Sequence, residues 1–318
     1  MRVTIVGAGA MGSLFGGRLA LAGNTVELVD VADSQIAAIN AGGLHLCLDG
    51  VEHRVRLRAG RAEAIRTLPD LLILFTKGPH SEAALASVRH LLGPGTWALT
   101  LQNGLGNGER LARHVPAERI LIGMTNWPAD VQGPGRVASH GAGEVRLWSY
   151  DGRPGERLQQ IARTLSEAGL QCTADPAVTT AIWEKVAFNA AMNAVAAITG
   201  FGVGEMADRP ELRALAADIV AEIVAVGRLA GFAVERTRIE HALDFAYAHH
   251  RSHLPSMLQD LRAGRATEID SINGAVVREA QRLGLPAPVN ATLTHLVHAL
   301  ERRASAQAVP APAVPCGA

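Results

Sequence analysis

The chain has 318 residues, enough for two domains of ordinary size, and its 30 basic and 30 acidic residues cancel. A neutral chain has no bulk attraction for nucleic acid or for an anionic membrane, so we expect a small-molecule partner. Cys47, Cys172 and Cys316 show no metal-ligand spacing and suit a reducing, cytoplasmic compartment. The first 20 residues contain neither a signal-peptide pattern nor an unbroken apolar run that could span a membrane.

The first predicted elements are a strand, a glycine turn and a helix. Three glycines have the G-x-G-x-x-G spacing, which lets the backbone turn tightly, approach a pyrophosphate and pack a helix on a strand. The pyrophosphate then lies at the helix N-terminus. The sequence therefore predicts a dinucleotide site whose cofactor contacts include Gly7, Gly9, Ala10, Met11 and Gly12.

A second strand, over residues 25–29, ends in Asp30, close to the expected distance of about 20 residues after the glycines. A carboxylate at this point accepts hydrogen bonds from ribose hydroxyls and repels a 2′-phosphate, so it favours NAD(H), with NADP(H) left open. The alternative interpretation is that Asp30 only caps the following helix, predicted over residues 34–40.

The next predicted elements are a hairpin and two buried strands. Alternating leucines over residues 44–48, followed by Asp49-Gly50, predict a hairpin that we expect at the antiparallel edge of the sheet. Nearly continuous apolar runs then end at Lys77 and just before Asn103. In open α/β sheets ligands bind beyond the carboxyl ends of the strands, so both residues are candidate cofactor contacts, and Asn103 is also a candidate substrate ligand. The alternative for each is an ordinary turn residue.

The texture of the sequence changes after residue 120. Short strands and turns replace helical crossovers up to residue 150, and one more helix, over 154–168, leads to the expected end of the first domain. The predicted fold is α/β plus all-α: a Rossmann-type dinucleotide-binding domain over 1–173 and an all-helical domain over 174–303. The proline- and alanine-rich residues 304–318 are expected to form a disordered tail.

A long apolar helix is predicted over residues 177–198. Lys185, Asn189 and Asn193 follow one another at intervals of four, and therefore form one polar stripe on this helix. A buried lysine is costly unless polar groups meet it, which makes Lys185 a candidate catalytic residue. The alternative is an interdomain lysine satisfied by carbonyl groups.

Later polar residues have structural alternatives of the same kind. His249 and His253 lie four residues apart, but no carboxylate or cysteine completes a ligand set, so no metal site is predicted. Ser256 begins a predicted helix and can cap it. Glu268 and Asp270 are placed in the first turn of another helix, where negative charge favours the helix dipole.

Six motifs of the chain occur together, in the same order, in a known family. They are Gly7-Ala-Gly9-Ala-Met-Gly12, Thr76-Lys77, Gln102-Asn103-Gly104, Trp183-Glu-Lys185-Val-Ala-Phe-Asn189, Ser256-Met-Leu-Gln-Asp260 and Thr267-Glu268-Ile-Asp-Ser-Ile-Asn-Gly274. On these motifs the sequence resembles the ketopantoate reductase (2-dehydropantoate 2-reductase) family over residues 1–303. The resemblance implies reduction of a 2-oxo acid, most simply 2-dehydropantoate, to an (R)-2-hydroxy acid by a nicotinamide cofactor, in a cleft between a Rossmann-type and a helical domain.

The resemblance also implies roles for single residues. The general acid of the family falls on Lys185, and the glutamate that contacts this lysine and the substrate hydroxyl falls on Glu268. The serine that binds the substrate carboxylate falls on Ser256, and Lys77 matches a lysine beside the nicotinamide. The substrate-binding asparagines fall on Asn103, Asn189 and, by continuation of the stripe, Asn193.

Two positions depart from the family pattern. Members that use NADPH usually have an arginine where this chain has Asp30, which again favours NADH. A substrate-binding asparagine of the family corresponds to Val203 here, and a buried hydroxyl without a partner costs about 1 to 3 kcal/mol. The alternatives are therefore an NAD-dependent D-2-hydroxyacid dehydrogenase for branched or aromatic 2-oxo acids, and a non-catalytic NAD-binding sensor. The apolar helical domain is compatible with a homodimer.

Overall fold

The computed structural model describes residues 1–308. The chain divides into two compact units, the first over Met1–Ile182 and the second beginning at Trp183. The division falls inside helix α6 (Val178–Asn189), nine residues after the boundary that the sequence predicts. Helix α13 (Pro288–Ala308) includes the first residues of the predicted tail, and the remainder of that tail lies outside the described residues.

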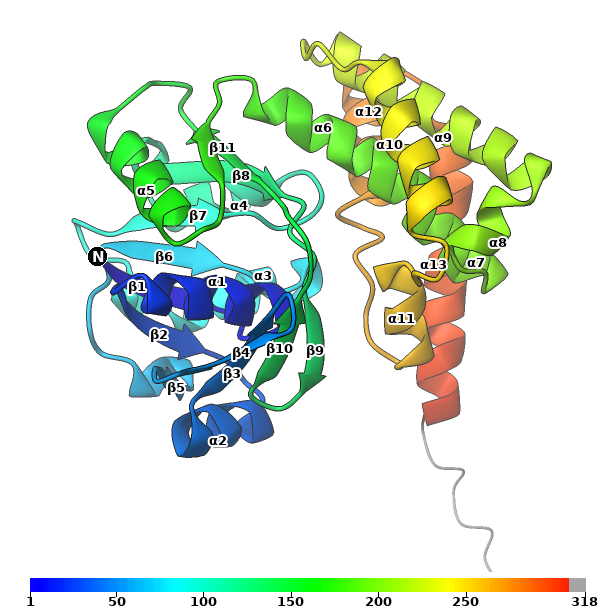
Figure 1. The fold of residues 1–318 in the computed structure, drawn as a ribbon. Coiled ribbons are helices and arrows are strands. Elements are labelled where there is room, and N and C mark those ends of the chain that lie inside the picture. The colour runs from blue at the N-terminus through cyan, green and yellow to red at the C-terminus, as the bar shows by residue number, and fades with distance from the viewer. Residues whose placement is uncertain (309–318) are drawn as a thin grey trace, which may run out of the picture. The chain divides into compact units, whose positions relative to one another are not determined.

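An eight-stranded sheet forms the centre of the first unit, in the order β12-β11-β8-β7-β6-β1-β2-β5 (Figure 1). The run from β8 to β5 is parallel throughout, whereas β11 is antiparallel to β8. The strands are β1 (Arg2–Val6), β2 (Thr25–Val29), β5 (Arg58–Gly60), β6 (Leu71–Leu74), β7 (Trp97–Thr100), β8 (Ile120–Thr125), β11 (Val145–Ser149) and β12 (Cys172–Ala174).

Apolar side chains cover both faces of this sheet, as the continuous apolar strands predict. All four residues of β6 are fully buried. Helices α1 (Ala10–Leu21) and α5 (Glu156–Glu167) supply one core, with Leu14, Phe15, Leu19, Leu158, Ile161 and Leu165. The opposite core contains residues of α3 (Ser81–Ser87) and α4 (Asn107–Ala112), namely Leu85 and Leu111. The sheet is therefore doubly wound, which directs its ligand site to the carboxyl ends of the parallel strands.

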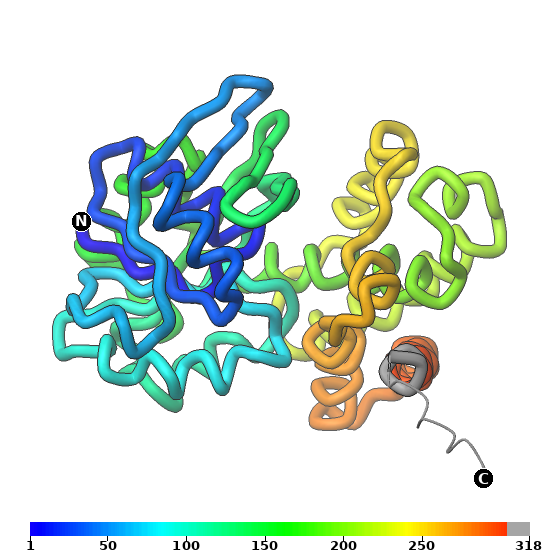
Figure 2. Tube along the Cα trace, turned by 90° about the horizontal axis from the view of Figure 1, so that it is seen from below, coloured from blue at the N-terminus to red at the C-terminus, as the bar shows by residue number. Residues whose placement is uncertain are grey.

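The predicted hairpin forms, but its predicted place in the fold is wrong. Strands β3 (Leu44–Leu48) and β4 (Val51–Val55) turn at Asp49-Gly50, where both residues have positive φ. They pair with β9 (Asp130–Gly133) and β10 (Arg136–Ser139) in a separate four-stranded sheet of order β4-β3-β10-β9. Figure 2 shows these hairpins, blue and green, side by side. The edge of the main sheet is instead β5, because β2 pairs there in parallel.

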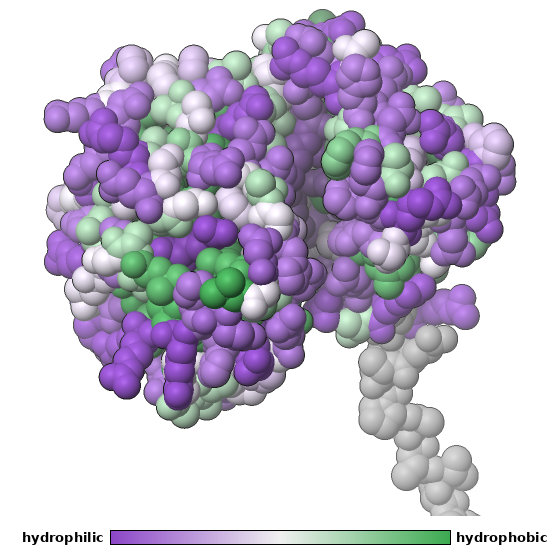
Figure 3. All heavy atoms as spheres, viewed as in Figure 1, coloured by the Kyte–Doolittle hydropathy of each residue, from purple (hydrophilic) through white to green (hydrophobic). Residues whose placement is uncertain are grey.

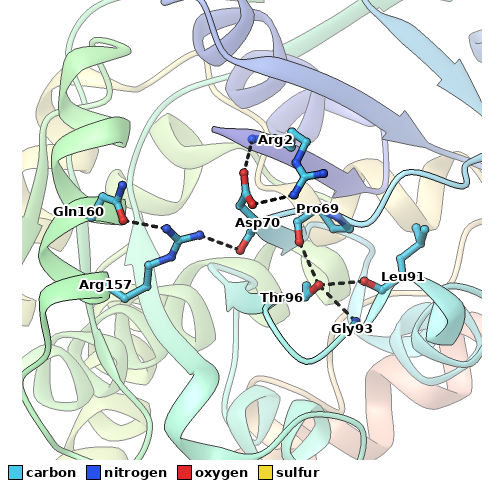
Figure 4. Close-up of polar contacts among 8 residues, drawn as sticks. All are labelled: Arg2, Pro69, Asp70, Leu91, Gly93, Thr96, Arg157 and Gln160. Atoms are coloured by element: carbon cyan, nitrogen blue, oxygen red, sulfur yellow. Dashed lines mark hydrogen bonds and ion pairs between the residues drawn. The ribbon is translucent and has the colours of Figure 1, made fainter.

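Polar contacts hold the amino ends of the central strands together (Figure 4). The Asp70 carboxylate accepts hydrogen bonds from the Arg2 backbone N–H at 2.8 Å and from the Arg2 guanidinium at 3.1 Å. Arg157 of α5 donates to the Asp70 carbonyl at 3.5 Å. The hydrogen bonds from Arg2 hold the pKa of the Asp70 carboxyl below its usual range. Hydrogen bonds and an ion pair therefore stabilise the amino ends of these strands, and the ligand site is expected at their carboxyl ends.

The second unit is helical. After α6 come a π-helical segment, η5 (Ala190–Ala194), and α7 (Val195–Thr199). The remaining helices are α8 (Val203–Ala207), α9 (Pro210–Leu229), α10 (Arg236–His249), α11 (Ser256–Arg262), α12 (Asn273–Leu283) and α13. Just before α6, the Asp175 carboxylate accepts the Ala177 N–H at 2.8 Å in the turn that leads into the helix.

Helix α9 packs against η5, α12 and α13, and a buried polar chain joins three of these elements. Glu222 of α9 accepts hydrogen bonds from the Val289 and Asn290 N–H groups at 2.8 and 2.9 Å, at the start of α13. Asn290 also donates its side-chain amide to Glu222, and accepts a hydrogen bond at 3.0 Å from Asn273, the first residue of α12. Glu222 therefore supplies the acceptors that the first N–H groups of α13 lack inside their own helix.

The surface of the first unit is mixed in character. Hydrophilic residues cover most of the face shown in Figure 3, and a small group of hydrophobic residues lies on the side that carries α1. Within residues 1–308 no helix is both long and apolar enough to cross a membrane. Across the same residues, no three His, Cys, Asp or Glu side chains are grouped as metal ligands would be. His249 instead stacks on Phe245, with ring centroids 4.3 Å apart.

Candidate active site

The glycine turn has the geometry that a dinucleotide requires. Gly7 has φ +99°, and a Cβ there would lie 2.8 Å from the Thr76 nitrogen. A Cβ on Gly12 would lie 1.8 Å from the Gly7 carbonyl oxygen, so the helix packs on the turn only because Gly12 has no side chain. A Cβ on Gly9 would meet nothing within 4 Å. The turn is thus tight where strand meets helix, and open at Gly9, where a pyrophosphate fits.

Helix α1 begins directly at this opening. Gly9 is its N-cap residue, and no side chain caps the helix. The backbone N–H groups of the first turn, including Ala10 and Met11, have no acceptor within an α-helix and form a ready anion site. The residues present therefore fit the pyrophosphate of a dinucleotide.

Asp30 orders the glycine turn as well as the segment that follows it. Its Oδ2 atom accepts the Ala8 N–H at 2.6 Å, and its Oδ1 atom accepts the Val31 and Ala32 N–H groups at 2.8 and 2.9 Å. Helix α2 (Asp33–Gly42) begins later, with Ala32 as its N-cap. Asp30 is therefore not a simple helix cap. Each carboxylate oxygen carries two lone pairs, so Oδ2 keeps capacity for a ribose hydroxyl.

Next to the glycine turn, the ends of β6 and β7 are tied together by a side chain that sequence reasoning passed over. The buried Gln102 amide donates to the Thr76 carbonyl and, at 2.7 Å, to the Ser81 hydroxyl, and its oxygen accepts the Thr100 hydroxyl at 3.0 Å. These contacts set the positions of the neighbouring candidates Lys77 and Asn103. The position of Gln102 immediately after a buried strand is the sequence feature that could have identified it.

Two further side chains support this edge of the sheet. Asn107 donates to the Asn103 carbonyl at 3.2 Å and so braces the turn after β7. Gln35 donates to the Ala8 carbonyl at 2.7 Å, while its oxygen accepts the Gly135 N–H at 2.7 Å. Gln35 thereby connects the glycine turn to the second sheet. The Gln35 contacts have no motif in the sequence, because they join segments that only the tertiary fold brings together, whereas Asn107 lies four residues after Asn103 in the same turn.

In the second unit, Lys185 lies on α6 and is partly buried. Burial lowers the pKa of its ammonium group from 10.5 to about 8, and the negative charge of Glu268 opposes that effect. Lys185 is therefore held near the pKa that suits proton transfer at neutral pH. The predicted electrostatic relation between Lys185 and Glu268 is present.

Glu268 does not occupy the helical position that the sequence predicts. Helix α12 begins at Asn273, and Glu268 lies in the turn before it, where its carbonyl accepts the Ser271 and Ile272 N–H groups at 3.0 Å each. Glu268 and Asp270 therefore do not stabilise a first helical turn. The Thr267 hydroxyl, which accepts the Ile269 N–H at 3.2 Å, competes with helix formation here.

Asn193 and Ser256 are neighbours in the same unit. The Ser256 hydroxyl lies 3.5 Å from the Asn193 side-chain oxygen. Ser256 is the first residue of α11, whose N-cap is Pro255, so the capping alternative for Ser256 is wrong. Asn189 is the last residue of α6, and Asn193 lies within the π-helical segment. The stripe therefore continues beyond Asn189 with a changed helical geometry.

Val203, the departure from the family pattern, is 1% exposed at the start of α8. Its N–H donates to the His253 carbonyl at 3.1 Å, and the next N–H, from Gly204, donates to the Arg251 carbonyl at 2.9 Å. The first two N–H groups of α8 thus already have backbone acceptors within the chain. Val203 offers an isopropyl group and no side-chain hydrogen bond.

A doubly wound sheet with an open glycine turn, joined to a helical unit with a lysine of lowered pKa, agrees with a nicotinamide-dependent oxidoreductase. The family model described as ketopantoate reductase PanE/ApbA matches residues 3–152, and the model of its C-terminal part matches residues 177–301. The 2-dehydropantoate 2-reductase of Streptococcus pyogenes is 36% identical over 302 residues, which are 95% of this chain and 98% of that protein. The chain belongs to the ketopantoate reductase family.

Solved structures agree with this assignment. The ternary structure of D-mandelate dehydrogenase with NADH and anilino(oxo)acetate is 32% identical, with a TM-score of 0.91 over 96% of this chain and 100% of that one. A PanE/ApbA family ketopantoate reductase from Ralstonia eutropha JMP134 is 30% identical, with a TM-score of 0.88 over 96% and 100%. The predicted family, fold class and enzyme class are confirmed.

Proposed function

We propose that the protein reduces a 2-oxo acid to an (R)-2-hydroxy acid, with 2-dehydropantoate as the first candidate substrate and pantoate as its product. The observation that carries the proposal is Lys185, whose pKa burial lowers to about 8 beside the charge of Glu268. A lysine in this state is protonated at neutral pH and yet releases its proton readily.

The first unit holds the cofactor in this proposal. The open space at Gly9 and the N-terminus of α1 bind the pyrophosphate, and Asp30 accepts hydrogen bonds from the adenosine ribose. The bound cofactor supplies a hydride from C4 of the reduced nicotinamide to the ketone carbon. Asp30 favours NADH, because a 2′-phosphate would meet its negative charge.

Lys185 donates the proton that completes the reduction. As the ketone carbon gains a hydride, negative charge develops on its oxygen, and the ammonium group of Lys185 stabilises that charge and transfers a proton to it. Glu268 opposes the effect of burial, so it keeps the lysine protonated at the pH of the reaction. The atoms then balance: one hydride and one proton convert the ketone into the alcohol.

A 2-oxo acid also has a carboxylate, which needs hydrogen-bond donors. Ser256, 3.5 Å from Asn193, supplies a hydroxyl for that group, and the Asn193 amide supplies two N–H donors. Asn189 lies one turn from Lys185 and orients the carbonyl. Asn103, which follows β7, is a further candidate substrate ligand. The helical unit thus presents a charged pair for the reacting oxygen and a neutral pair for the carboxylate.

A second candidate function, an NADH-dependent D-2-hydroxyacid dehydrogenase for branched or aromatic 2-oxo acids, is favoured by Val203. This apolar side chain has no hydrogen-bonding group for the C4 hydroxyl of 2-dehydropantoate, which lowers the preference expected for that substrate. The similarity to D-mandelate dehydrogenase supports the same alternative.

A matrix of initial rates tests both candidates: NADH and NADPH against 2-dehydropantoate, 2-oxo-3-methylbutanoate and phenylglyoxylate. A kcat/KM for 2-dehydropantoate at least tenfold above the others supports the first candidate, and the reverse order supports the second. Tight cofactor binding without turnover of any 2-oxo acid would refute both and leave the sensor. NADPH preferred by more than tenfold, about 1.4 kcal/mol, would refute the role given to Asp30.

A further inference from the structure

An ion pair lies beside Asp30, at the rim of the proposed adenosine site. Strand β5 runs parallel to β2, and the Asp30 N–H donates to the Gly60 carbonyl at 3.1 Å where the two strands end. Arg61 follows Gly60 directly. Its guanidinium Nε lies 3.0 Å and its Nη2 2.8 Å from Oδ1 of Asp33, the first residue of α2. The pairing of these strand ends therefore brings a cation next to the residue expected to bind the ribose.

Asp33 holds this cation in place. The Arg61 side chain is 46% exposed and the Asp33 side chain is 79% exposed. The hydrogen bond between them lowers the pKa of Asp33 and raises the pKa of Arg61. An arginine near this position is what a 2′-phosphate needs, because the guanidinium donates paired hydrogen bonds to phosphate oxygens. While it is paired with Asp33, Arg61 already donates its hydrogen bonds to a carboxylate, and the negative charge of Glu63 also acts on it.

We propose that Asp33 is a second specificity residue for the cofactor, which restrains Arg61 and so disfavours the 2′-phosphate of NADPH. The inference rests on the proposed function, since it assumes that a nicotinamide dinucleotide binds at Asp30. Cofactor choice is then set by two acids with different actions. Asp30 repels the phosphate directly, whereas Asp33 withholds the one arginine that the end of β5 provides.

The test measures binding rather than turnover. Dissociation constants for NADH and NADPH are determined by nicotinamide fluorescence on the full chain, for the wild type, Asp33→Asn and the double variant Asp33→Asn/Arg61→Gln. Because the pair is exposed, its contribution is modest, and we expect Asp33→Asn to lower the ratio of the NADPH to the NADH dissociation constant about fivefold. This fall in the ratio should disappear in the double variant and become smaller in 0.5 M salt, since the effect is electrostatic.

A matched control comes from the second unit. Arg213 and Asp244 form an exposed pair at 2.7 Å, with exposures of 45% and 59%, and Asp244→Asn should leave the ratio unchanged. The inference is overturned if Asp33→Asn leaves the ratio unchanged, or if the ratio falls equally in the double variant that lacks Arg61. In either case, NADH binding by the wild type leaves the proposed function intact. If the wild type binds neither dinucleotide, the proposed function fails as well.

Discussion

Lys185→Met should make the protein more stable and nearly inactive. The pKa of Lys185 falls from 10.5 to about 8 because burial disfavours its charge. A difference of this size corresponds to at most about 3.5 kcal/mol of folding free energy, which is the cost of keeping the buried ammonium group charged at neutral pH. Methionine fills similar volume without that charge, so we expect the variant to gain about 1 to 3 kcal/mol at pH 7.

The stability that Lys185→Met gains depends on pH, because the folded and unfolded chains bind protons at Lys185 with different pKa values. Between pH 8 and 10.5 the unfolded chain binds more protons at this lysine than the folded protein does, so the stability of the wild type rises with pH. The advantage of Lys185→Met therefore shrinks through that interval and is smallest above about pH 10.5. Turnover should fall by about 100-fold or more, because the proton donor is absent. In the wild type, kcat/KM for reduction should fall above about pH 8.

Urea unfolding at pH 7 and pH 10 measures the stability, and initial rates of NADH oxidation measure the turnover. Lys185→Arg is the matched control, since it keeps a positive charge that cannot be released, and should lose turnover without gaining stability. Lys77 and Lys185 are the only lysines of the chain, so lysine-selective NMR labelling gives two signals, and the titration of Lys185 can be read directly. An equal stability difference at both pH values would refute the reasoning on burial, and normal turnover would remove Lys185 from the mechanism.

Three other changes separate cofactor binding from folding. Gly9→Ala should fold normally and weaken dinucleotide binding about tenfold. Gly12→Ala should instead lower the yield of folded protein, because its Cβ would lie 1.8 Å from a carbonyl oxygen. Circular dichroism measures the folding of both variants, and cofactor titration measures their binding. Asp70→Asn should cost about 1 kcal/mol at pH 7 in urea unfolding. The cost should begin to shrink as the pH falls below 3.8, the usual pKa of this carboxyl, and should vanish only below the lowered pKa that the carboxyl has in the folded protein. Glu222→Ala should cost about 1 to 3 kcal/mol in thermal unfolding, since partly buried N–H groups of α13 lose their acceptor, and an unchanged Tm would contradict this.

The features that local physics dictates could be predicted from the sequence. The spacing of Gly7, Gly9 and Gly12 predicts a backbone that turns tightly, approaches a pyrophosphate and packs a helix on a strand. In the structure Gly7 has a positive φ, Gly9 is open and Gly12 packs against the Gly7 carbonyl. The apolar run over residues 70–77 predicts a strand buried on both faces, which β6 confirms. Each prediction depends on neighbours within about 10 residues, so no knowledge of distant partners is needed.

Features that depend on distant partners could not be predicted in this way. The alternation over residues 44–48 indicates a hairpin, but only the pairing of His45 with Arg136 decides that β3 joins a second sheet. The role of Gln102 requires the ends of β6 and β7 to be adjacent. Glu268 precedes its helix because Thr267 hydrogen bonds to the Ile269 N–H, and a helical pattern in the sequence does not reveal that competition.

The polar stripe of the long helix passes through a change of helical geometry that the spacing of its residues does not predict. An interval of four residues keeps side chains on one face only while the helix has 3.6 residues per turn. The segment Ala190–Ala194 is π-helical, with i→i+5 hydrogen bonds, and such single turns occur frequently at functional sites. Alanines carry no signal for this change, because they fit either helix. The wider turn gives Asn193 a direction that the spacing alone does not predict, and there it lies against Ser256 while Lys185 interacts with Glu268. Under the proposed function, one helix addresses two chemically different ends of a 2-oxo acid.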